Sequence, residues 1–236
     1  GYEQEAPFKL PFEYTIQIPG ILQGQGYGED ISIHTPWVSG LHDPLWYIRE
    51  EYKEGQENGI HVPFLSQPPK HYLGVAWYQK EIEVEEGFYE FEIECTKWKT
   101  EVFLDGKSMG SVTSLCAPHS FELGKITKGS HLLTVKVDNQ MQYPYRPDGH
   151  GVSDALAASW NGMVGRVCLK KIPDISIQHV VLKPDLESKE LKATLFFHNR
   201  LQKEKEGSLY FTIIDKESGK QKQALYSVQI LAGKGR

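Results

Sequence analysis

Apolar and polar side chains alternate with a strict period of two between residues 88 and 96. Apolar residues occupy every second position from Tyr89 to Cys95, and Glu90, Glu92 and Glu94 fill the positions between them. Because successive side chains of a strand point to opposite faces, this alternation predicts a strand with one buried face and one solvated face. Strands with one solvent-exposed face are typical of antiparallel sheets.

Shorter segments of the same character recur along the chain, separated by Gly, Pro and Asp. Between residues 99 and 110, the pair Asp105-Gly106 predicts a type I′ hairpin turn, which needs a positive φ at both central residues. The register of this hairpin places Val102 opposite Met109. The other predicted strands cover residues 14–19, 72–84, 88–96, 120–126, 131–137, 165–172, 175–182, 191–198, 208–214 and 223–231.

Helical signals are weak throughout the chain. We find no segment in which capping residues flank a continuous apolar stripe with a period of about 3.6 residues. Many short strands with Gly and Pro at their joints instead predict an all-β fold, either a sandwich or a jelly roll.

Two segments break the strand pattern. Residues 21–70 are rich in Gly and Pro, and residues 150–160 are mostly small and polar. A compact domain rarely carries such long loops without using them, so both are candidate site loops. The alternatives are an ordered cover for a sheet edge in the first case and a loop packed under Trp160 in the second. Trp37 and Trp46 of the first loop could supply a stacking face, but buried structural tryptophans are commoner.

The stretch Ile172-Pro173-Asp174 is the expected joint between two domains, 1–172 and 173–236. The residues after it alternate again and resemble the start of an immunoglobulin-like sandwich. A complete sandwich of that kind has about seven strands in about 100 residues. We therefore expect the second domain to be incomplete or abbreviated, with a sheet edge that further chain would cover.

Composition excludes several classes of protein. The net charge of −5 and the lack of basic runs argue against binding to nucleic acid. No apolar stretch reaches the roughly 18 residues of a membrane span. The cysteines Cys95, Cys116 and Cys168 are odd in number and widely spaced, which argues against a disulfide framework and a zinc site. We expect no cofactor and no metal, and we expect Cys95 to be a buried free thiol.

Several short motifs occur in an order that resembles a known family. A strand ending in Ile-Pro-Gly is followed by GVAWYQK at 74–80, VFLDGK at 102–107, LTVKVDN at 133–139 and WNGMVG at 160–165. This order is similar to that of the N-terminal sugar-binding domain of glycoside hydrolase family 2, which includes β-galactosidases, β-glucuronidases and β-mannosidases. The resemblance implies a jelly-roll (galactose-binding-like) β-sandwich over 1–172 and an incomplete immunoglobulin-like β-sandwich over 173–236.

In that family the chemistry belongs to a separate (β/α)8 barrel, where two glutamates act as acid/base and nucleophile. The resemblance therefore implies a non-catalytic region of an exo-acting glycosidase, because the barrel is absent from this sequence. Glu90, Glu92 and Glu94 do not replace it, since they belong to the solvated strand face. The implied partners are a non-reducing-end sugar and the barrel of the same polypeptide, with a homo-oligomer of the full-length protein as a further option.

The resemblance also implies a location and a site. The long loop resembles a branch of exported enzymes, so a periplasmic or extracellular protein is expected; Gly1 in place of Met means that a signal segment would already be removed. In the family, a loop before the closing strand carries an acid to the exo-subsite, and here that acid is Asp154. A carboxylate suits this role because it can accept two hydroxyl hydrogens.

Three further residues complete the substrate-binding candidates, namely His150, Trp160 and Asn161. Each has a plainer alternative: Asp154 could cap its own loop, His150 could be a solvated surface residue, Trp160 could pack beneath the loop, and Asn161 could form the turn before Gly162. No catalytic residue and no metal ligand is expected. A free-standing carbohydrate-binding module or surface lectin is the competing function, and an interaction scaffold is a third.

Overall fold

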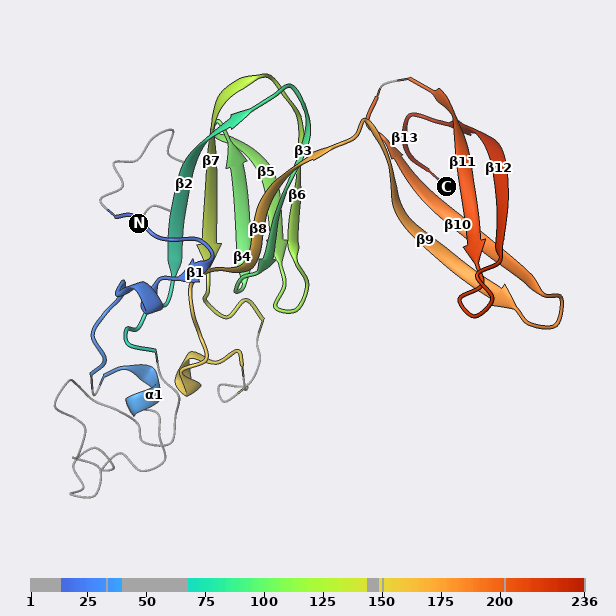
Figure 1. Cartoon of the computed structure of the whole chain (residues 1–236). Coiled ribbons are helices and arrows are strands. Elements are labelled where there is room, and N and C mark those ends of the chain that lie inside the picture. Colours follow the sequence, from blue (N-terminus) through green and yellow to red (C-terminus); the bar gives the residue numbers. More distant parts are fainter. Residues whose placement is uncertain are drawn as a thin grey trace. The chain divides into compact units, whose positions relative to one another are not determined.

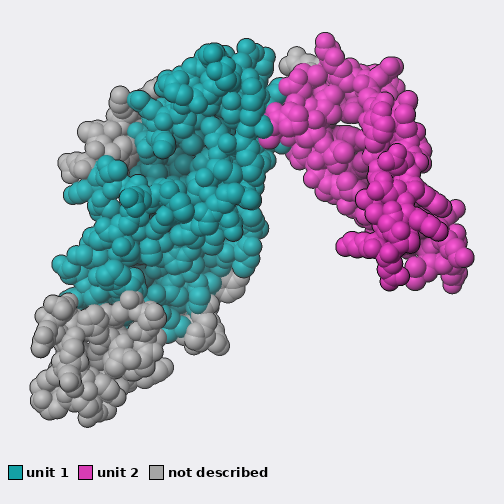
Figure 2. Space-filling view, in the orientation of Figure 1, with its two compact units in different colours: residues 1–171 teal, residues 172–236 magenta. Residues whose placement is uncertain are grey.

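The computed structural model describes residues 14–32, 34–39, 68–143, 149, 151–201 and 203–235. His150, Trp46 and the rest of the long loop between 40 and 67 lie outside the described residues. The chain divides into two compact units, Gly1–Lys171 and Ile172–Arg236, which Figure 2 colours separately.

The first unit is a sandwich of two four-stranded sheets, ordered β1-β8-β3-β6 and β2-β7-β4-β5 (Figure 1). The antiparallel pairs are nested: β1 pairs with β8, β2 with β7, β3 with β6, and β4 with β5. This nesting is the strand order of a jelly roll, and the predicted all-β sandwich is confirmed. The strands are β1 (Gly20–Ile21), β2 (Val75–Val84), β3 (Gly87–Cys95), β4 (Lys99–Leu104), β5 (Lys107–Thr113), β6 (His119–Ile126), β7 (Gly129–Asp138) and β8 (Gly162–Ile172).

The core lies between the inner faces of the two sheets. Phe91 and Ile93 of β3 pack there in one cluster with Val102 of β4 and Val135 of β7. The period-two prediction for β3 is therefore confirmed on its apolar side. Cys95, at the strand's end, is only half-buried, so the expectation of a buried thiol is wrong.

The outer face of β3 is less open than the sequence suggested. Only 13% of the Glu92 side chain is exposed, because basic side chains of the neighbouring strand β8 cover it. Arg166 Nη2 lies 2.8 Å and Lys170 Nζ 2.7 Å from its carboxylate oxygens. These ion pairs lower the pKa of Glu92, with the hydrogen bond from Lys170 as the main cause. The glutamates on the outer face of β3 are thus engaged by residues of β8 and are not freely solvated.

The hairpin between β4 and β5 confirms its predicted turn but not its predicted register. Asp105 and Gly106 have φ values of 50° and 80°, as a type I′ turn requires. A β-bulge between Val102 and Phe103 shifts the pairing, so that Val102 lies opposite Gly110 and not opposite Met109. Gly110 has a φ of 113°, a conformation that glycine adopts without the strain that a Cβ would add.

Residues 14–19 do not form the predicted strand. The first strand is reduced to β1, and Pro19 directly before it has no N–H to donate to a ladder. The side chain of Gln25 takes the place of a partner strand for Gln17: the Gln17 N–H donates to Gln25 Oε1 at 2.8 Å, and Gln25 Nε2 donates to the Gln17 carbonyl at 2.9 Å.

The two ends of the sandwich differ in their connections. The turns at 85–86, 105–106 and 127–128 are short and share one end. The long connections, 22–74 and 139–161, share the other end, where Figure 1 shows the helical segments. These segments are η1 (Gln23–Gln25), α1 (Pro36–Ser39) and η5 (Asp154–Leu156), of which η1 and η5 are 3-10 helices. In the described part of the chain, no helix has the length and apolar character needed to span a membrane.

The second unit consists of a three-stranded sheet, β13-β10-β9, and a two-stranded sheet, β11-β12. None of its described apolar residues is fully buried, and Leu182 and Ile213 are more than half exposed. The apolar faces of these sheets are therefore incompletely covered, and the immunoglobulin-like assignment stays a prediction. The strands are β9 (Ile175–Asp185), β10 (Glu190–Asn199), β11 (Lys205–Ile214), β12 (Gln221–Ile230) and β13 (Gly233–Gly235).

Candidate functional site

Asp154 opens a short ordered turn within the loop that precedes β8. Ser153 caps η5, and its Oγ accepts a hydrogen bond from the Ala155 N–H at 3.1 Å. Ala157 ends the turn in the left-handed region with a φ of 55°, and its N–H donates to the Asp154 carbonyl. The local sequence therefore fixes the backbone at Asp154 and leaves the carboxylate to make other contacts.

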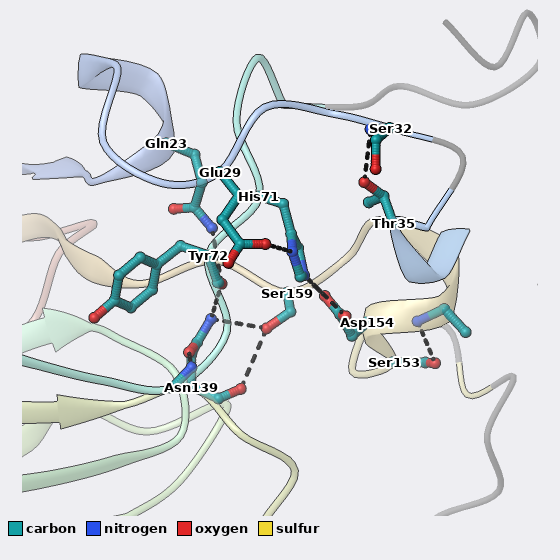
Figure 3. A network of polar contacts seen from close by, with 12 residues as sticks. Gln23, Glu29, Ser32, Thr35, His71, Tyr72, Asn139, Ser153, Asp154 and Ser159 are labelled. Carbon is teal, nitrogen blue, oxygen red and sulfur yellow. Dashed lines mark hydrogen bonds and ion pairs between the residues drawn. The ribbon is translucent and has the colours of Figure 1, made fainter. Parts of the chain in front are cut away.

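The carboxylate of Asp154 lies against His71, which is four residues before the start of β2 (Figure 3). His71 Nε2 is 3.2 Å from Oδ1 and 3.1 Å from Oδ2 of Asp154. Only about a seventh of each side chain is exposed, with values of 14% for His71 and 15% for Asp154. On the other side of the ring, Nδ1 lies 3.9 Å from a carboxylate oxygen of Glu29, whose side chain is largely exposed.

The backbone of His71 is held by the segment that carries Glu29. The His71 N–H donates to the Glu29 carbonyl at 2.9 Å, and the Glu29 N–H donates back at 2.8 Å. Gly28 permits this close approach, because a Cβ at that position would lie 2.3 Å from the His71 carbonyl oxygen. Glycine at position 28 is thus a requirement of the His71 site.

Helix α1 supplies an aromatic wall to the same site. It begins with Pro36, a residue suited to a first helical position, and Thr35 before it exchanges hydrogen bonds with Ser32. Trp37 is fully buried and meets the His71 ring edge to face, with ring centroids 5.1 Å apart. Helix α1 also packs against η5, so the wall supports both partners of the pair.

The charges around His71 favour its protonated form. The hydrogen bond with Asp154 raises the pKa of His71 above its ordinary value, and the negative charges of Asp154 and Glu29 add to the rise. Burial acts in the opposite direction but does not cancel these effects. Since a carboxylate can only accept, Nε2 carries the hydrogen that joins the pair.

Lys97 ties the two ends of the Asp154 loop together. Its Nζ donates to the carbonyl of Gly151 at 2.5 Å and to the carbonyl of Ala158 at 2.6 Å. The same ammonium lies 5.6 Å from the ring centre of Trp160, which is half-buried. Burial lowers the pKa of Lys97. Trp160 therefore lies beside the ammonium that bridges the loop, and its role as a packing or a ligand-contacting residue stays a prediction.

Asn161 is an interior residue and not a ligand contact. Its side chain is fully buried: Oδ1 accepts from Tyr78 Oη at 2.8 Å, and Nδ2 donates to the carbonyls of Gly74 and Val137. With no exposed surface and every polar atom engaged, it cannot reach a sugar, so its place among the substrate-binding candidates is wrong. Burial raises the pKa of Tyr78 far above its ordinary value.

The structure therefore separates the sequence candidates. It brings Asp154 and Trp160 to one loop, places Asn161 beneath them, and leaves His150 outside the described residues. Trp37 is too deeply buried to stack on a ligand. Sequence reasoning missed His71 and Lys97, which lie 83 and more than 50 positions from their partners in the loop. The one local signal was their position beside a strand, His71 before β2 and Lys97 between β3 and β4.

The described residues of the site offer the acceptor oxygens of Asp154 and one charged donor, His71. Among the described residues, no cluster of three or more His, Cys, Asp or Glu side chains is arranged to hold an ion. A carboxylate has about four lone-pair positions, and His71 uses only part of them. The remaining positions on Asp154 can accept hydrogens from neutral hydroxyl groups.

A separate cleft runs beside β2, which is an edge strand of its sheet. Its volume is about 650 Å³, and aromatic rings make up much of its lining. The lining includes Tyr14, Tyr27, Tyr72, Trp77 and Tyr78. This cleft does not include Asp154 or His71.

Comparison with known proteins gives a fold but no close relative. No protein-family model matches the chain, and no curated protein matches it. Solved structures do match. A β-glucuronidase from glycoside hydrolase family 2 is 16% identical, with a TM-score of 0.56, over 70% of this chain and 20% of its own.

Two further structures give the same result. A Bacteroides uniformis β-glucuronidase is 17% identical over 85% of this chain and 24% of its own, with a TM-score of 0.55. A Parabacteroides merdae β-glucuronidase is 15% identical over 70% of this chain and 23% of its own, with a TM-score of 0.50. At these identities the likeness establishes a shared fold. The chain spans less than a third of the length of the structures that it matches.

Proposed function

We propose that this chain is the non-catalytic N-terminal region of an exo-acting glycosidase of family 2. In this proposal its long-loop end contributes Asp154 to the sugar subsite of a catalytic barrel that belongs to the same polypeptide. The observation that carries the proposal is the Asp154–His71 pair, which holds a carboxylate in one place at the loop end of a jelly roll. The shared fold with family 2 structures supports it.

The chemistry of the pair suits a sugar hydroxyl better than it suits bond cleavage. A retaining glycosidase needs two carboxyl groups about 5 Å apart on either side of the glycosidic bond. Here the nearest carboxylates, Asp154 and Glu29, bracket a single imidazole ring. Asp154 can instead accept hydroxyl hydrogens in charge-assisted bonds, which are about twice as strong as neutral ones.

The proposal extends to the setting of the protein. An exported enzyme, periplasmic or extracellular, that acts on a non-reducing-end sugar is the expected whole. Docking of the loop end on the barrel would complete the subsite, and the full-length protein could assemble as a homo-oligomer. The second unit is proposed to be the immunoglobulin-like domain that follows the jelly roll in this family.

Turnover by the full-length gene product tests the proposal. The natural polypeptide would be assayed on a panel of nitrophenyl glycosides, with Asp154→Ala as the variant. We expect hydrolysis of at least one glycoside and a loss of about 10²-fold in kcat/KM for the variant. Asp30→Ala is the matched control, because Asp30 is an exposed carboxylate of the same region that pairs with Lys70. Unchanged kcat/KM in Asp154→Ala would remove Asp154 from the subsite.

A free-standing carbohydrate-binding module is the second candidate, and the cleft beside β2 favours it. Aromatic rings and tyrosine hydroxyls are the usual lining of a sugar-binding cleft. Titration of the present chain with mono- and oligosaccharides, followed by calorimetry, separates the two functions. Affinity that is lost in Tyr14→Ala and kept in Asp154→Ala would favour the module. The enzyme proposal predicts weak or undetectable affinity for the chain by itself.

A further inference from the structure

His71 is not assigned to any role by the sequence pattern or by the family resemblance. We propose that His71 is the positioning residue of the sugar site: it fixes the orientation of the Asp154 carboxylate, and its protonation sets the pH range in which that orientation is held. The sugar contact rests on the proposed function. The coupling between the two side chains does not depend on it.

The contact geometry determines which way the carboxylate faces. Nε2 lies almost equally far from the two oxygens of Asp154, at 3.2 and 3.1 Å. One N–H shared between both oxygens places the ring on the side between them and leaves the outer lone pairs unused. Each oxygen therefore keeps an outer position from which it can accept one hydroxyl hydrogen.

His71 is itself held from three directions, so it can impose this orientation. The reciprocal backbone hydrogen bonds with Glu29 fix its main chain. The edge-to-face contact with the buried Trp37 fixes the ring plane, at an angle of 78°. The Glu29 carboxylate, 3.9 Å from Nδ1, attracts the far side of the ring. Packing and hydrogen bonds of this kind are what hold the rotamer of a positioning residue.

Among the residues that the structure describes, the charges that face the His71 ring come from two elements. Asp154 belongs to η5, and Glu29 belongs to the segment that exchanges backbone hydrogen bonds with His71. Helix α1 contributes the uncharged Trp37. The neighbouring Lys70 is paired with Asp30 and so adds little net charge. Two carboxylates around one imidazole favour the imidazolium form. When the pH rises through the His71 pKa, the imidazolium charge is lost and the hydrogen bond from Nε2 to the Asp154 carboxylate becomes weaker.

The first arm of the test uses the present chain. Imidazole nitrogen chemical shifts would be followed by NMR through a pH titration in the native chain and in Asp154→Asn. We expect the His71 midpoint to lie above its ordinary value of 6.5 and to fall in the variant. His131 is an internal control, because it pairs with Asp105 at the other end of the sandwich and should not shift. An unchanged His71 midpoint would overturn the coupling.

The second arm uses the full-length enzyme and compares the native protein with Asp154→Ala, His71→Gln, His71→Phe and the double variant of Asp154→Ala with His71→Phe. Glutamine keeps a neutral N–H donor, so we expect a loss of about tenfold in kcat/KM that shrinks as the pH rises through the His71 pKa. Phenylalanine keeps the packing on Trp37 without a donor and should approach the loss seen in Asp154→Ala. The double variant His71→Phe with Asp154→Ala should be no worse than Asp154→Ala alone, because the two residues act as a unit.

The outcomes distinguish this inference from the proposed function. Additive losses in the double variant, or a His71→Gln effect that does not depend on pH, would show that His71 has only a structural role. Full activity in both His71 variants, with Asp154→Ala impaired, would overturn the positioning role and keep the proposed function. No effect of Asp154→Ala would overturn both. His131→Gln should leave kcat/KM unchanged in every case.

Discussion

At the scale of single residues, neighbours decide which histidines carry a proton. His131 faces an acceptor on both ring nitrogens: Nδ1 lies 2.6 Å from Asp105 Oδ2, and Nε2 lies 3.0 Å from the Thr127 carbonyl. Both nitrogens can donate at once only in the imidazolium form, so these two acceptors favour that form. His119 is buried, and its ring needs to donate from only one nitrogen, because Thr100 Oγ1 can donate to Nδ1. Burial lowers the pKa of His119.

The His131 pair should make stability depend on pH in a defined direction. The hydrogen bond with Asp105 raises the pKa of His131, so its contribution is complete below the unfolded-state value of 6.5 and is lost as the pH rises through the folded-state value. We expect His131→Gln to lower the free energy of unfolding more at about pH 5.5 than at about pH 8.5. Urea unfolding at the two pH values measures this difference, and an equal loss at both would contradict the assignment.

At the scale of elements, alternation predicts the strands well and their pairing less well. Strand β3 follows from its period of two, and the β4–β5 turn follows from Asp105-Gly106. The bulge at Val102 and the loss of the 14–19 strand do not follow. Both depend on partners that alternation does not encode, namely a glycine on the facing strand and the Gln25 side chain that satisfies Gln17.

The site loop shows the same limit more strongly. Asp154 could be proposed from the resemblance and from its position before the closing strand. His71 could not, because no periodicity relates two residues 83 positions apart. Asn161 was misjudged for a related reason: its hydrogen-bonding partners include residues of η1, β2, β7 and the segment before β2, which only the folded chain brings together.

Lys97 should determine the order of the whole Asp154 loop. Lys97→Met removes the donor to the Gly151 and Ala158 carbonyls and keeps most of the side-chain volume. We expect a cost of about 1 kcal/mol in the free energy of unfolding, because two hydrogen bonds from a charged donor are lost to carbonyls that are exposed or only partly buried. Hydrogen exchange of residues 151–158 should become faster, whereas exchange in β3 should be unchanged. Lys97→Arg keeps a charged donor and is the matched comparison; equal protection in all three proteins would argue against the tether.

At the scale of the whole molecule, the two ends of the jelly roll have different roles. Short turns close one end, and the other gathers the long loops that hold Asp154, His71 and Trp37. A fold by itself does not specify a function. The functional argument therefore rests on this one end and on the carboxylate that it presents, within a chain that spans less than a third of the matched glycosidase structures.

The most direct test of the account is a coupling measurement between Asp154 and one sugar hydroxyl in the full-length enzyme. Values of kcat/KM would be determined for a glycoside and its mono-deoxy analogues, with the native protein and with Asp154→Ala. If Asp154 accepts a hydrogen from one hydroxyl, removing either partner should cost about the same, and removing both should cost little more, with a coupling of about 1.5–3 kcal/mol. Strictly additive losses for every deoxy analogue would contradict the claim that this loop completes a sugar subsite.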